Sequence, residues 1–541
     1  MNEKEVWLKS RKITPEKMRL ARLALAEVLE GTPALEAIKH YPTSDGYIGK
    51  YALVAAYNAM VAKGEIDAST EILAKIRMKP VRTLSGVTTV TVLTKPYPCP
   101  GKCIFCPDDV RMPKSYLPDE PGAMRGLHHK FDPFEQVASR LEALEAVGHP
   151  TDKIELLILG GTWSSYRRDY QEWFIKRCFD ALNSVEAEYA EEKIAEGELT
   201  ESHRLNESAA HRNVGLVIET RPDEVTPDEL AWLRYLGATK VQMGAQSLDD
   251  KILALNKRGH TVQELRDAMA LLRAGGFKLV LHWMPNLLGA TLESDTVDFL
   301  RLWDGIAPDE LKIYPTQLLK ETELYPYWER GEYKPYTTAE LISLIADVKP
   351  SIPRYCRANR IIRDIPSTNV VEGNKRTSLR MDVHKEMAER GTECECLRCR
   401  EVRGKKIDIE KLKLDDLIYP AENAEEHFIS FITPDDKVAG FLRLSLPSVA
   451  APETVIAGLE GAAIIREVHV YGQSLEVGAE KRGSAQHAGL GTRLLEEAEQ
   501  IALKSGFARM AVIAAVGTRK YYLGRGYTRG QLYLVKEIGN T

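Results

Sequence analysis

The spacing of hydrophobic residues changes character along the chain. From Val6 to Leu29, and again from Tyr51 to Ile76, apolar residues recur at the three- and four-residue spacing of amphipathic helices. From Val87 onward, short runs of β-branched and apolar residues alternate with segments of helical periodicity. The pattern predicts a helical N-terminal region over residues 1–80, followed by a different architecture.

The middle of the chain contains six strand-like runs, each followed by a helix-like segment. They cover residues 87–94, 154–159, 214–219, 240–244, 279–284 and 311–314. Strands that alternate with helices form parallel βαβ units, and six units indicate a partial (β/α)6 TIM-like barrel over residues 81–353. The chemistry of such barrels lies at the carboxyl ends of the strands. Residues 183–212 are charged and rich in alanine, and we expect them to form an exposed helical insertion.

The last part of the chain follows a third pattern. Over residues 407–541 we expect an α+β domain, with strands at 438–444, 463–471 and 509–516 and a helix at 489–505. The preceding segment, 354–406, is the most basic stretch and is predicted to be a linker. The fold class is therefore α/β, with a central barrel between a helical region and an α+β domain.

Chain length and net charge limit the possible functions but do not identify one. The chain has 541 residues and a net charge of −5, so a basic footprint for nucleic acid can only be local. Cations do gather near the N-terminus, where they form either a solvated helix face or an arm that binds phosphate. They are Lys9, Arg11, Lys12, Lys17, Arg19 and Arg22. No apolar run approaches the ~20 residues of a membrane span, and no secretion signal is visible, so we expect a cytoplasmic protein without a membrane partner.

Six of the eight cysteines form two tight clusters. The first reads Cys99-Pro-Gly-Lys-Cys103-Ile-Phe-Cys106 and directly follows a predicted strand. Three thiolates can hold three irons of a [4Fe–4S] cluster and leave the fourth iron open for S-adenosylmethionine (SAM). A structural zinc site or a ferredoxin would need a fourth local ligand. The spacing resembles the radical SAM motif, and Gly160-Gly161-Thr162 resembles the glycine motif that lies beside SAM in that superfamily.

A second nucleotide-type motif lies in the C-terminal domain. Gln486-His-Ala-Gly489-Leu490-Gly491 fits the signature of the GNAT acetyltransferases and opens a predicted helix. Glycines allow the backbone to approach a pyrophosphate, and the free N–H groups of a helix start bind its charge. In GNAT domains a tyrosine in the place of Tyr521 and Tyr522 lies near the sulfur of CoA, where a phenol can donate a proton. Core packing is the alternative role for both tyrosines.

The two modules together resemble the family of the catalytic subunit of Elongator, in its stand-alone prokaryotic form. The resemblance rests on the sequence segments 218–222, 243–247, 314–316, 466–472 and 517–522, and it covers essentially the whole chain. It implies an acyltransferase that modifies carbon 5 of the wobble uridine, position 34 of tRNA, towards 5-carboxymethyluridine. It also implies the anticodon stem-loop, acetyl-CoA, SAM and an electron donor as partners. Which tRNAs are modified, and whether the protein is a monomer or a homodimer, stay open.

The resemblance assigns roles residue by residue. It implies that Cys99, Cys103 and Cys106 bind the cluster, in a loop shorter than that of eukaryotic members, and that Lys153 contacts acetyl-CoA from the barrel. It also implies a set of residues around the cofactor in the C-terminal domain. They are Glu467, Val468, His469 and Val470 beside the acetyl group, Leu490, Gly491 and Thr492 at the pyrophosphate, and Tyr522 with its neighbour Tyr521 at the thioester.

The second cysteine cluster departs from the eukaryotic pattern, where several of these cysteines are absent. Cys394, Cys396 and Cys399 lie within a basic segment, and His384 precedes them by ten residues. Three thiolates and one imidazole suit a tetrahedral zinc site, with His384 as the candidate fourth ligand.

The family implies a radical mechanism. SAM would yield a 5′-deoxyadenosyl radical that removes hydrogen from the acetyl methyl group, and the resulting carbon radical would add to C5. Two other hypotheses stay open at this stage, a protein lysine acetyltransferase and a tRNA-binding scaffold without activity. The cysteine loop discriminates between them, because a lysine acetyltransferase would not need it.

Overall fold

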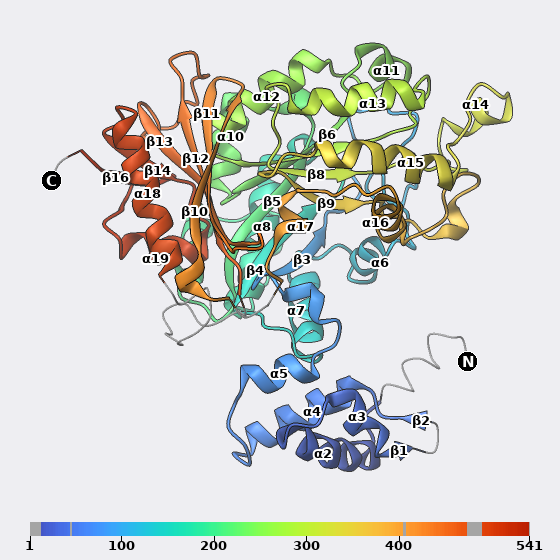
Figure 1. The fold of residues 1–541 in the computed structure, drawn as a ribbon, viewed down its shortest axis with the longest axis vertical. Coiled ribbons are helices and arrows are strands. Elements are labelled where there is room, and N and C mark those ends of the chain that lie inside the picture. The colour runs from blue at the N-terminus through green and yellow to red at the C-terminus, as the bar shows by residue number, and fades with distance from the viewer. Residues whose placement is uncertain (1–11, 44–45, 404–406, 473–488, 540–541) are drawn as a thin grey trace.

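The computed structural model describes residues 12–43, 46–403, 407–472 and 489–539. The N-terminal region is helical, as predicted, and protrudes from the main body as a small bundle (Figure 1). Its elements are α2 (Pro15–Leu29), α3 (Ala34–Lys39), β1 (Pro42–Thr43), β2 (Gly46–Tyr47), α4 (Lys50–Ala62) and α5 (Thr70–Ile76). Thr14 caps α2 by accepting a hydrogen bond from the backbone N–H of Lys17, and the apolar faces of α2 and α4 form a separate core.

The N-terminal cations differ in their surroundings. Lys12 and Arg19 are exposed, whereas Arg22 forms an ion pair with Glu65 of the same bundle. Lys9 and Arg11 lie outside the described residues. Part of the predicted basic arm is therefore available to solvent, and part is used to hold the bundle together.

The centre of the molecule is a curled parallel sheet of seven strands in chain order, which confirms the predicted α/β barrel class. The strands are β3 (Thr88–Leu93), β4 (Lys153–Leu159), β5 (Arg212–Thr220), β6 (Lys240–Gln246), β7 (Lys278–Trp283), β8 (Glu310–Ile313) and β9 (Arg357–Ile361). Strands β3 and β9 are its two edges, so the barrel stays open.

Strand β9 differs from the sequence analysis, which placed residues 357–361 in the basic linker and counted six strands. These residues pair in parallel with β8, and Ala358 and Ile361 are buried. The run Arg-Ala-Asn-Arg-Ile shows little hydrophobic periodicity because its polar residues face the inside of the barrel, which is itself polar. The parallel sheet thus extends into the segment that we assigned to the linker.

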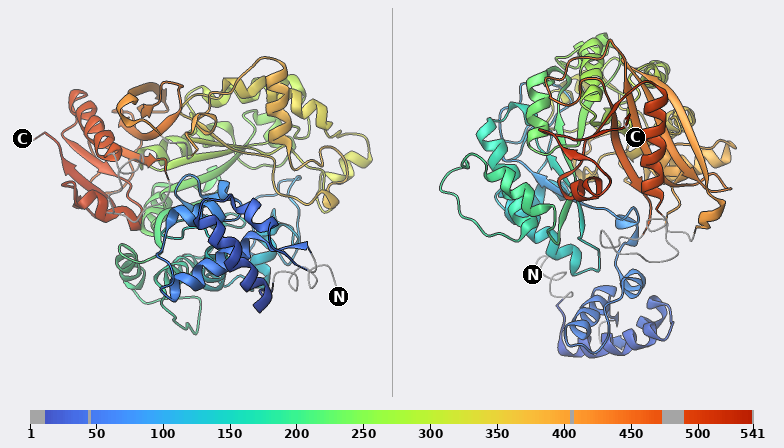
Figure 2. Two further views of the ribbon diagram at one scale, coloured as in Figure 1. Left: turned by 60° about the horizontal axis from the view of Figure 1, so that its bottom comes forward. Right: turned by 90° about the vertical axis from the view of Figure 1, so that its left-hand side faces the viewer.

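Helices cover the outer face of the sheet (Figures 1 and 2). The helices of this part of the chain are α6 (Pro121–His128), α7 (Pro133–Glu145), α8 (Arg168–Asn183), α10 (Pro227–Tyr235), α11 (Asp250–Leu255), α12 (Val262–Ala274), α13 (Leu292–Leu300), α14 (Tyr325–Glu329), α15 (Thr338–Val348), α16 (Leu379–Glu389) and α17 (Leu397–Arg400). Of these, α14 protrudes from the main body (Figure 1), and residues of α6 and α16 line the interior cavity. In the predicted insertion only α9 (Glu198–Asn206) is helical, and Leu199 and Asn206 are buried against the domain. The expected exposed helix is therefore shorter and partly packed.

The inner face of the sheet is not packed in the same way. Along β4, Ile154, Leu156 and Ile158 point outward and are fully buried, whereas the alternate residues remain partly exposed. Successive side chains of a strand point to opposite faces, so these partly exposed residues point into the barrel. The inside of the barrel is therefore hollow along this strand.

The C-terminal domain is a mixed sheet with one long helix, as predicted. Its strands are β10 (Lys413–Ala421), β11 (Ala424–Ile432), β12 (Val438–Pro447), β13 (Ala462–Val470), β14 (Arg509–Val512), β15 (Thr528–Arg529) and β16 (Leu534–Glu537), and its helices are α18 (Leu490–Lys504) and α19 (Arg519–Leu523). Strands β13 and β14 pair in parallel only from Ala462 to Ile465 and then separate. The separation leaves one edge of 466–470 without β14 as a partner.

The C-terminal domain packs against the amino-terminal edge of the barrel sheet. Asp309, just before β8, accepts hydrogen bonds from Arg466 at 2.7 and 2.8 Å and forms an ion pair with Arg443 at 3.3 Å. All three side chains are fully buried or nearly so. Burial disfavours the ionised carboxylate, but the two arginines outweigh it and keep the pKa of Asp309 below its ordinary value. The interface is a buried ionic network with fixed geometry, and it joins the two domains in one orientation.

Candidate functional site

The cysteine loop lies at the carboxyl end of β3, where barrel chemistry is expected. Backbone hydrogen bonds hold it in place, from Ile104 N–H to the Asn256 carbonyl at 3.2 Å and from Leu324 N–H to the Ile104 carbonyl at 2.9 Å. Hydrogen bonding with Cys106 lowers the pKa of the Cys103 thiol to about 5, against the opposing effect of burial. Cys103 and Cys106 are therefore adjacent, whereas Cys99 contacts Thr162, with Sγ and Oγ1 3.4 Å apart.

Two buried arginines face this loop. Arg258 Nη1 lies 3.7 Å from the sulfur of Cys103, and a Cβ added at Gly101 would clash with Nη1 of Arg221. Within the described residues, Nη1 of Arg221 and Nε of Arg258 are buried and make no hydrogen bond. Unsatisfied buried donors are costly, so the loop is suited to a negatively charged group that carries acceptors. An iron–sulfur cluster with sulfide acceptors fits that requirement.

The glycine motif lies next to the cysteine loop. Gly160 follows β4 directly, and a Cβ there would clash with Oγ1 of Thr94, so only glycine allows this close approach of β4 to β3. The structure thus brings Gly160, Gly161 and Thr162 to the edge of the sheet that holds Cys99, in the place where the sequence analysis puts SAM.

The predicted acetyl-CoA residues gather at the opposite end of the barrel. His469 on β13 has a buried Nε2 without a hydrogen bond among the described residues, and burial lowers its pKa to about 4. The charge of Lys153, the first residue of β4, also lowers that pKa across the domain boundary. Burial also raises the pKa of Tyr522, which keeps its phenol protonated as a hydrogen-bond donor. Val468 lines the same cavity.

The glycine turn begins α18. Gly489 has φ +70°, a conformation that favours glycine, and Leu490 and Gly491 open the helix. A Cβ at Gly491 would lie 2.5 Å from the hydroxyl of Tyr521, and Arg525 donates to Oγ1 of Thr492 at 3.0 and 3.2 Å. The turn is therefore backed by the Tyr521 ring and by one cation. Gln486 lies outside the described residues.

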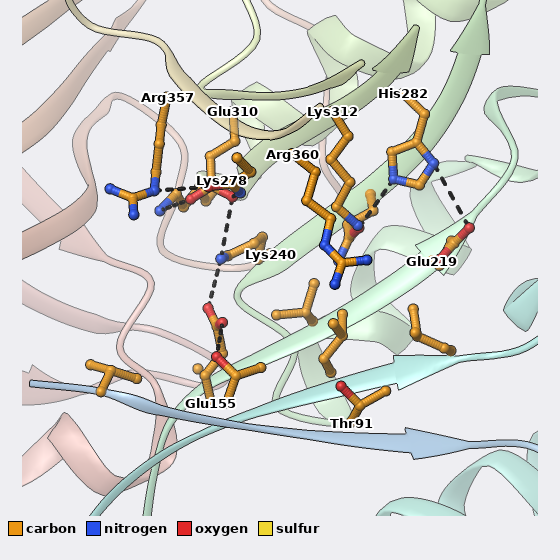
Figure 3. A pocket seen from close by; sticks show the side chains of 18 of the residues that line it. Thr91, Glu155, Glu219, Lys240, Lys278, His282, Glu310, Lys312, Arg357 and Arg360 are labelled. Carbon is orange, nitrogen blue, oxygen red and sulfur yellow. Dashed lines mark hydrogen bonds and ion pairs between the residues drawn. The ribbon is translucent and has the colours of Figure 1, made fainter. Parts of the chain in front are cut away.

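One cavity of about 1650 Å³ reaches both ends of the barrel. Phe105 and Cys106 line it at the carboxyl edge, and His469 and Tyr522 line it at the amino edge. Between them it is bounded by the inward-facing side chains of all seven strands (Figure 3).

Ion pairs cross this cavity near its amino-terminal end. Lys278 pairs with Glu467 of β13 and with Glu310, both at 2.6 Å. Lys240 pairs with Glu310 at 3.6 Å and with Glu155 at 2.6 Å, which connects β6 to β4 across the interior (Figure 3). Glu467, expected beside the acetyl group, is therefore also the first member of a chain of charges that enters the barrel.

The second cysteine cluster is compact. The sulfurs of Cys394, Cys396 and Cys399 all lie within 4.8 Å of one another. His384 does not join them in the structure, and instead the ammonium of Lys349, which is 0% exposed, donates to the sulfur of Cys399 at 3.6 Å. His384 lines the cavity from α16, and its role as the fourth zinc ligand stays a prediction.

Sequence reasoning did not single out several residues that line the cavity or face the cysteine loop. Arg221 and Gln246 lie within sequence segments that resemble the Elongator family, and this resemblance was the only signal in the sequence that marked them. Arg258, Lys312 and His282 had none, because single polar residues on predicted strands and loops are common. The curled sheet and the cysteine loop bring them together.

Comparison with known proteins agrees with these observations. The profile of the radical SAM superfamily matches residues 97–300, and that of the Radical_SAM C-terminal domain matches residues 308–389. No helix in the described ranges is both long and apolar enough to cross a membrane.

Relatives match most of the chain. A tRNA uridine(34) acetyltransferase of Methanocaldococcus jannaschii is 42% identical over 480 residues, 86% of each chain. Elongator complex protein 3 of Homo sapiens is 34% identical over 489 residues, 86% of this chain and 87% of the human one. The solved structure of Methanocaldococcus infernus Elp3 with residues 1–46 deleted superposes with a TM-score of 0.71 at 38% identity, covering 84% of this chain and 100% of that one. The chain therefore belongs to the Elongator complex protein 3 family and carries a radical SAM domain.

Proposed function

We propose that this protein is a tRNA uridine(34) acetyltransferase that modifies C5 of the wobble uridine towards 5-carboxymethyluridine. The observation that carries the proposal is the single cavity that reaches both the cysteine loop and the strand 467–470. A relative named for this activity is 42% identical over 86% of the chain. A lysine acetyltransferase would have no use for a cavity that extends to the cysteine loop.

At the carboxyl end of the barrel, Cys99, Cys103 and Cys106 would hold a [4Fe–4S] cluster, and the glycine motif after β4 would bind SAM. When bound, this pair supplies a 5′-deoxyadenosyl radical that can remove hydrogen from an unactivated methyl group. Arg221 and Arg258 would donate hydrogen bonds to the cluster and its sulfur ligands, and their charge stabilises the thiolates.

At the amino end, a GNAT-type site would hold acetyl-CoA. Gly489 to Thr492 would bind the pyrophosphate through the N–H groups at the start of α18. The separated strands β13 and β14 leave the backbone of 466–470 open to the amides of the pantetheine arm. Tyr522 would donate a hydrogen bond to the sulfur, and Lys153 would contact the cofactor from the barrel.

The target tRNA would bind across the N-terminal bundle and the basic segment 354–403. Phosphate contacts from lysine and arginine supply most of the affinity of such complexes. The uridine must leave the anticodon stack to reach the carboxyl mouth of the barrel. An electron donor would reduce the cluster, and the cytoplasm is the compartment where these substrates meet.

The compact cysteine cluster would bind zinc with three thiolates, and His384 is the candidate fourth ligand. The contacts of this cluster favour a structural role for the metal. Arg400 donates to Asp436 in the turn between β11 and β12, and Lys437 donates to the carbonyl of Cys399 at 3.5 Å. A metal there would fix the segment between barrel and C-terminal domain.

The test is direct. The purified protein is incubated anaerobically with SAM, acetyl-CoA, a reductant and unmodified tRNA, and the nucleosides are analysed by mass spectrometry. We expect 5-carboxymethyluridine at position 34 only when all components are present. Acetylated protein without any modified nucleoside would support the lysine acetyltransferase instead.

A further inference from the structure

The two predicted cofactor sites lie at opposite ends of one strand. Lys153 begins β4, and Gly160 follows its last residue. Seven residues of a parallel strand rise about 3.3 Å each, so the two positions are ~23 Å apart. If the proposed function holds, an acetyl group held near Tyr522 must move along the barrel before it can react at the cysteine loop.

The cavity provides a route for this movement. The interior of a closed eight-stranded barrel is filled by layers of packed side chains. Here β3 and β9 do not pair, and the inward residues Thr89, Thr91, Glu155 and Leu157 keep solvent-accessible surface. One continuous hollow along the inner face of the sheet connects the two ends.

The charges along this route suit a small anion. Lys278 and Lys240 stand at the amino end in the chain of ion pairs that begins at Glu467. Farther in, Lys312 and Arg360 extend into the same space (Figure 3). Lys278 and Lys240 already pair with carboxylates of the protein, so among the described residues Lys312 is the ammonium on this route that a carboxylate ligand could pair with.

Lys312 is the most informative of these residues. Its side chain belongs to a residue only 9% exposed, and it donates to the side-chain oxygen of Gln242, which also accepts from His282 Nε2 at 3.1 Å. Among the described residues no carboxylate forms an ion pair with it, although Glu219 lies close enough for Lys312 to oppose the rise that burial causes in its pKa. A buried ammonium without an anion is costly. The position is therefore suited to a negatively charged ligand.

We infer that the barrel interior is a passage for acetate. At the Tyr522 end, the oxygen of a water molecule bonds to the acyl carbon, the C–S bond breaks, CoA leaves as a thiol, and the remaining proton goes to solvent. The acetate then moves past Lys240 to Lys312 and on to the cysteine loop. An intact pantetheine arm fits this route less well, because the Glu155–Lys240 pair that spans the interior would have to separate for it.

Binding is tested first, without turnover. Fluoroacetate is added to the purified holoprotein, without acetyl-CoA or tRNA, and its 19F line width is recorded. We expect broadening that added acetate reverses and that Lys312→Met weakens by about tenfold in apparent affinity, as for loss of one buried charge pair. Lys504→Met, an exposed lysine at the end of α18, is the control. Equal broadening in both variants would overturn the Lys312 site.

Passage is tested by blocking the interior. Leu157→Trp and Thr91→Trp each add bulk where β3 and β4 face the cavity, and Leu156→Met, on the outward face, is the control. We expect release of CoA and cleavage of SAM to continue within about twofold, while modified uridine falls at least about tenfold. In the wild type, 13C from labelled acetyl-CoA should enter the product undiluted by unlabelled acetate in the buffer.

The outcomes separate the hypotheses. If the wild type makes no modified uridine, the proposed function fails. If it does, and both tryptophan variants modify tRNA at the wild-type rate, the passage is wrong while the function stands. If the tryptophan variants lose acetyl-CoA binding itself, an intact pantetheine arm occupies the interior, and the acetate proposal is wrong.

Discussion

The two ends of the barrel satisfy their buried charges in different ways. At the amino-terminal edge, arginines of the C-terminal domain pair with Asp309, and Lys278 pairs with Glu467, so each of these ions faces an opposite charge that the protein supplies. At the carboxyl edge, Arg221 and Arg258 have buried N–H groups that no described residue accepts. The charges at the amino-terminal edge therefore hold two domains together, whereas the donors at the carboxyl edge are suited to a bound group.

The largest effect is expected from a variant that disrupts only the cluster site at the carboxyl end of the barrel. Cys103→Ser should reduce tRNA modification below detection and remove the signal of the reduced cluster, because three thiolates are needed to hold it. Release of CoA in the presence of tRNA should persist, since that chemistry lies at the other end. Nucleoside mass spectrometry, electron paramagnetic resonance and a CoA assay measure the three quantities.

A matched control for that variant is Cys178→Ala, since Cys178 lies on the buried face of α8 and does not line the cavity. It should keep its iron and its activity. Normal formation of 5-carboxymethyluridine by Cys103→Ser would contradict the radical mechanism.

The next largest effect is expected from a variant that disrupts the ionic network at the amino-terminal edge. Arg466→Met leaves Asp309 and Glu426 without their main partner and should lower the free energy of unfolding by about 3–5 kcal/mol. Urea denaturation followed by circular dichroism measures it. Arg509→Met, which removes an exposed pair with Glu537, should cost less than about 1 kcal/mol. Equal losses would show that the interface network is not special.

The acetyl-CoA site can be weakened without unfolding. Tyr522→Ala should reduce tRNA-stimulated release of CoA by about 100-fold or more, as for loss of a proton donor. Lys153→Ala should also reduce it strongly, because a positioned charge is lost. The affinity for tRNA and the cluster spectrum should not change. Hydrolysis that is equally fast without tRNA would refute the coupling, and wild-type behaviour of Lys153→Ala would refute the cross-domain role of this lysine.

The compact cysteine cluster should bind about one zinc per chain beside the iron, as a four-ligand structural site does. Cys396→Ala combined with Cys399→Ala should lose that zinc and lower the thermal midpoint, while the radical SAM cluster stays loaded. Metal analysis and calorimetry check this. Full retention of zinc in the double variant would place the metal elsewhere.

The smallest effect concerns the N-terminal bundle. Neutralising Lys12, Lys17 and Arg19 should weaken the binding of all tRNAs alike. The slope of log affinity against log salt should fall by about 1 for each phosphate that the protein no longer neutralises. Filter binding over a salt series measures it. A weaker affinity for one tRNA alone would indicate recognition of bases rather than of phosphates.

The sequence by itself determined the order of the elements and the chemistry of the motifs. Local periodicity predicts strands such as 154–159 and the helix at 489–505. The spacing of Cys99, Cys103 and Cys106 predicts that they bind a cluster. Local patterns suffice there, because neighbours in the chain form each element. The family resemblance then supplied the roles of Lys153 and Tyr522, which periodicity alone leaves open.

Only the tertiary structure decided which distant residues meet. Strand β9 was hidden because its polar residues face a polar interior, and the structure brings the sulfurs of Cys394, Cys396 and Cys399 within 4.8 Å of one another. Lys349 contacts Cys399 from 50 positions away, and Lys312 reaches Gln242 from 70. The curl of the sheet and the docking of the C-terminal domain create the cavity, and no local pattern encodes that curvature or that docking.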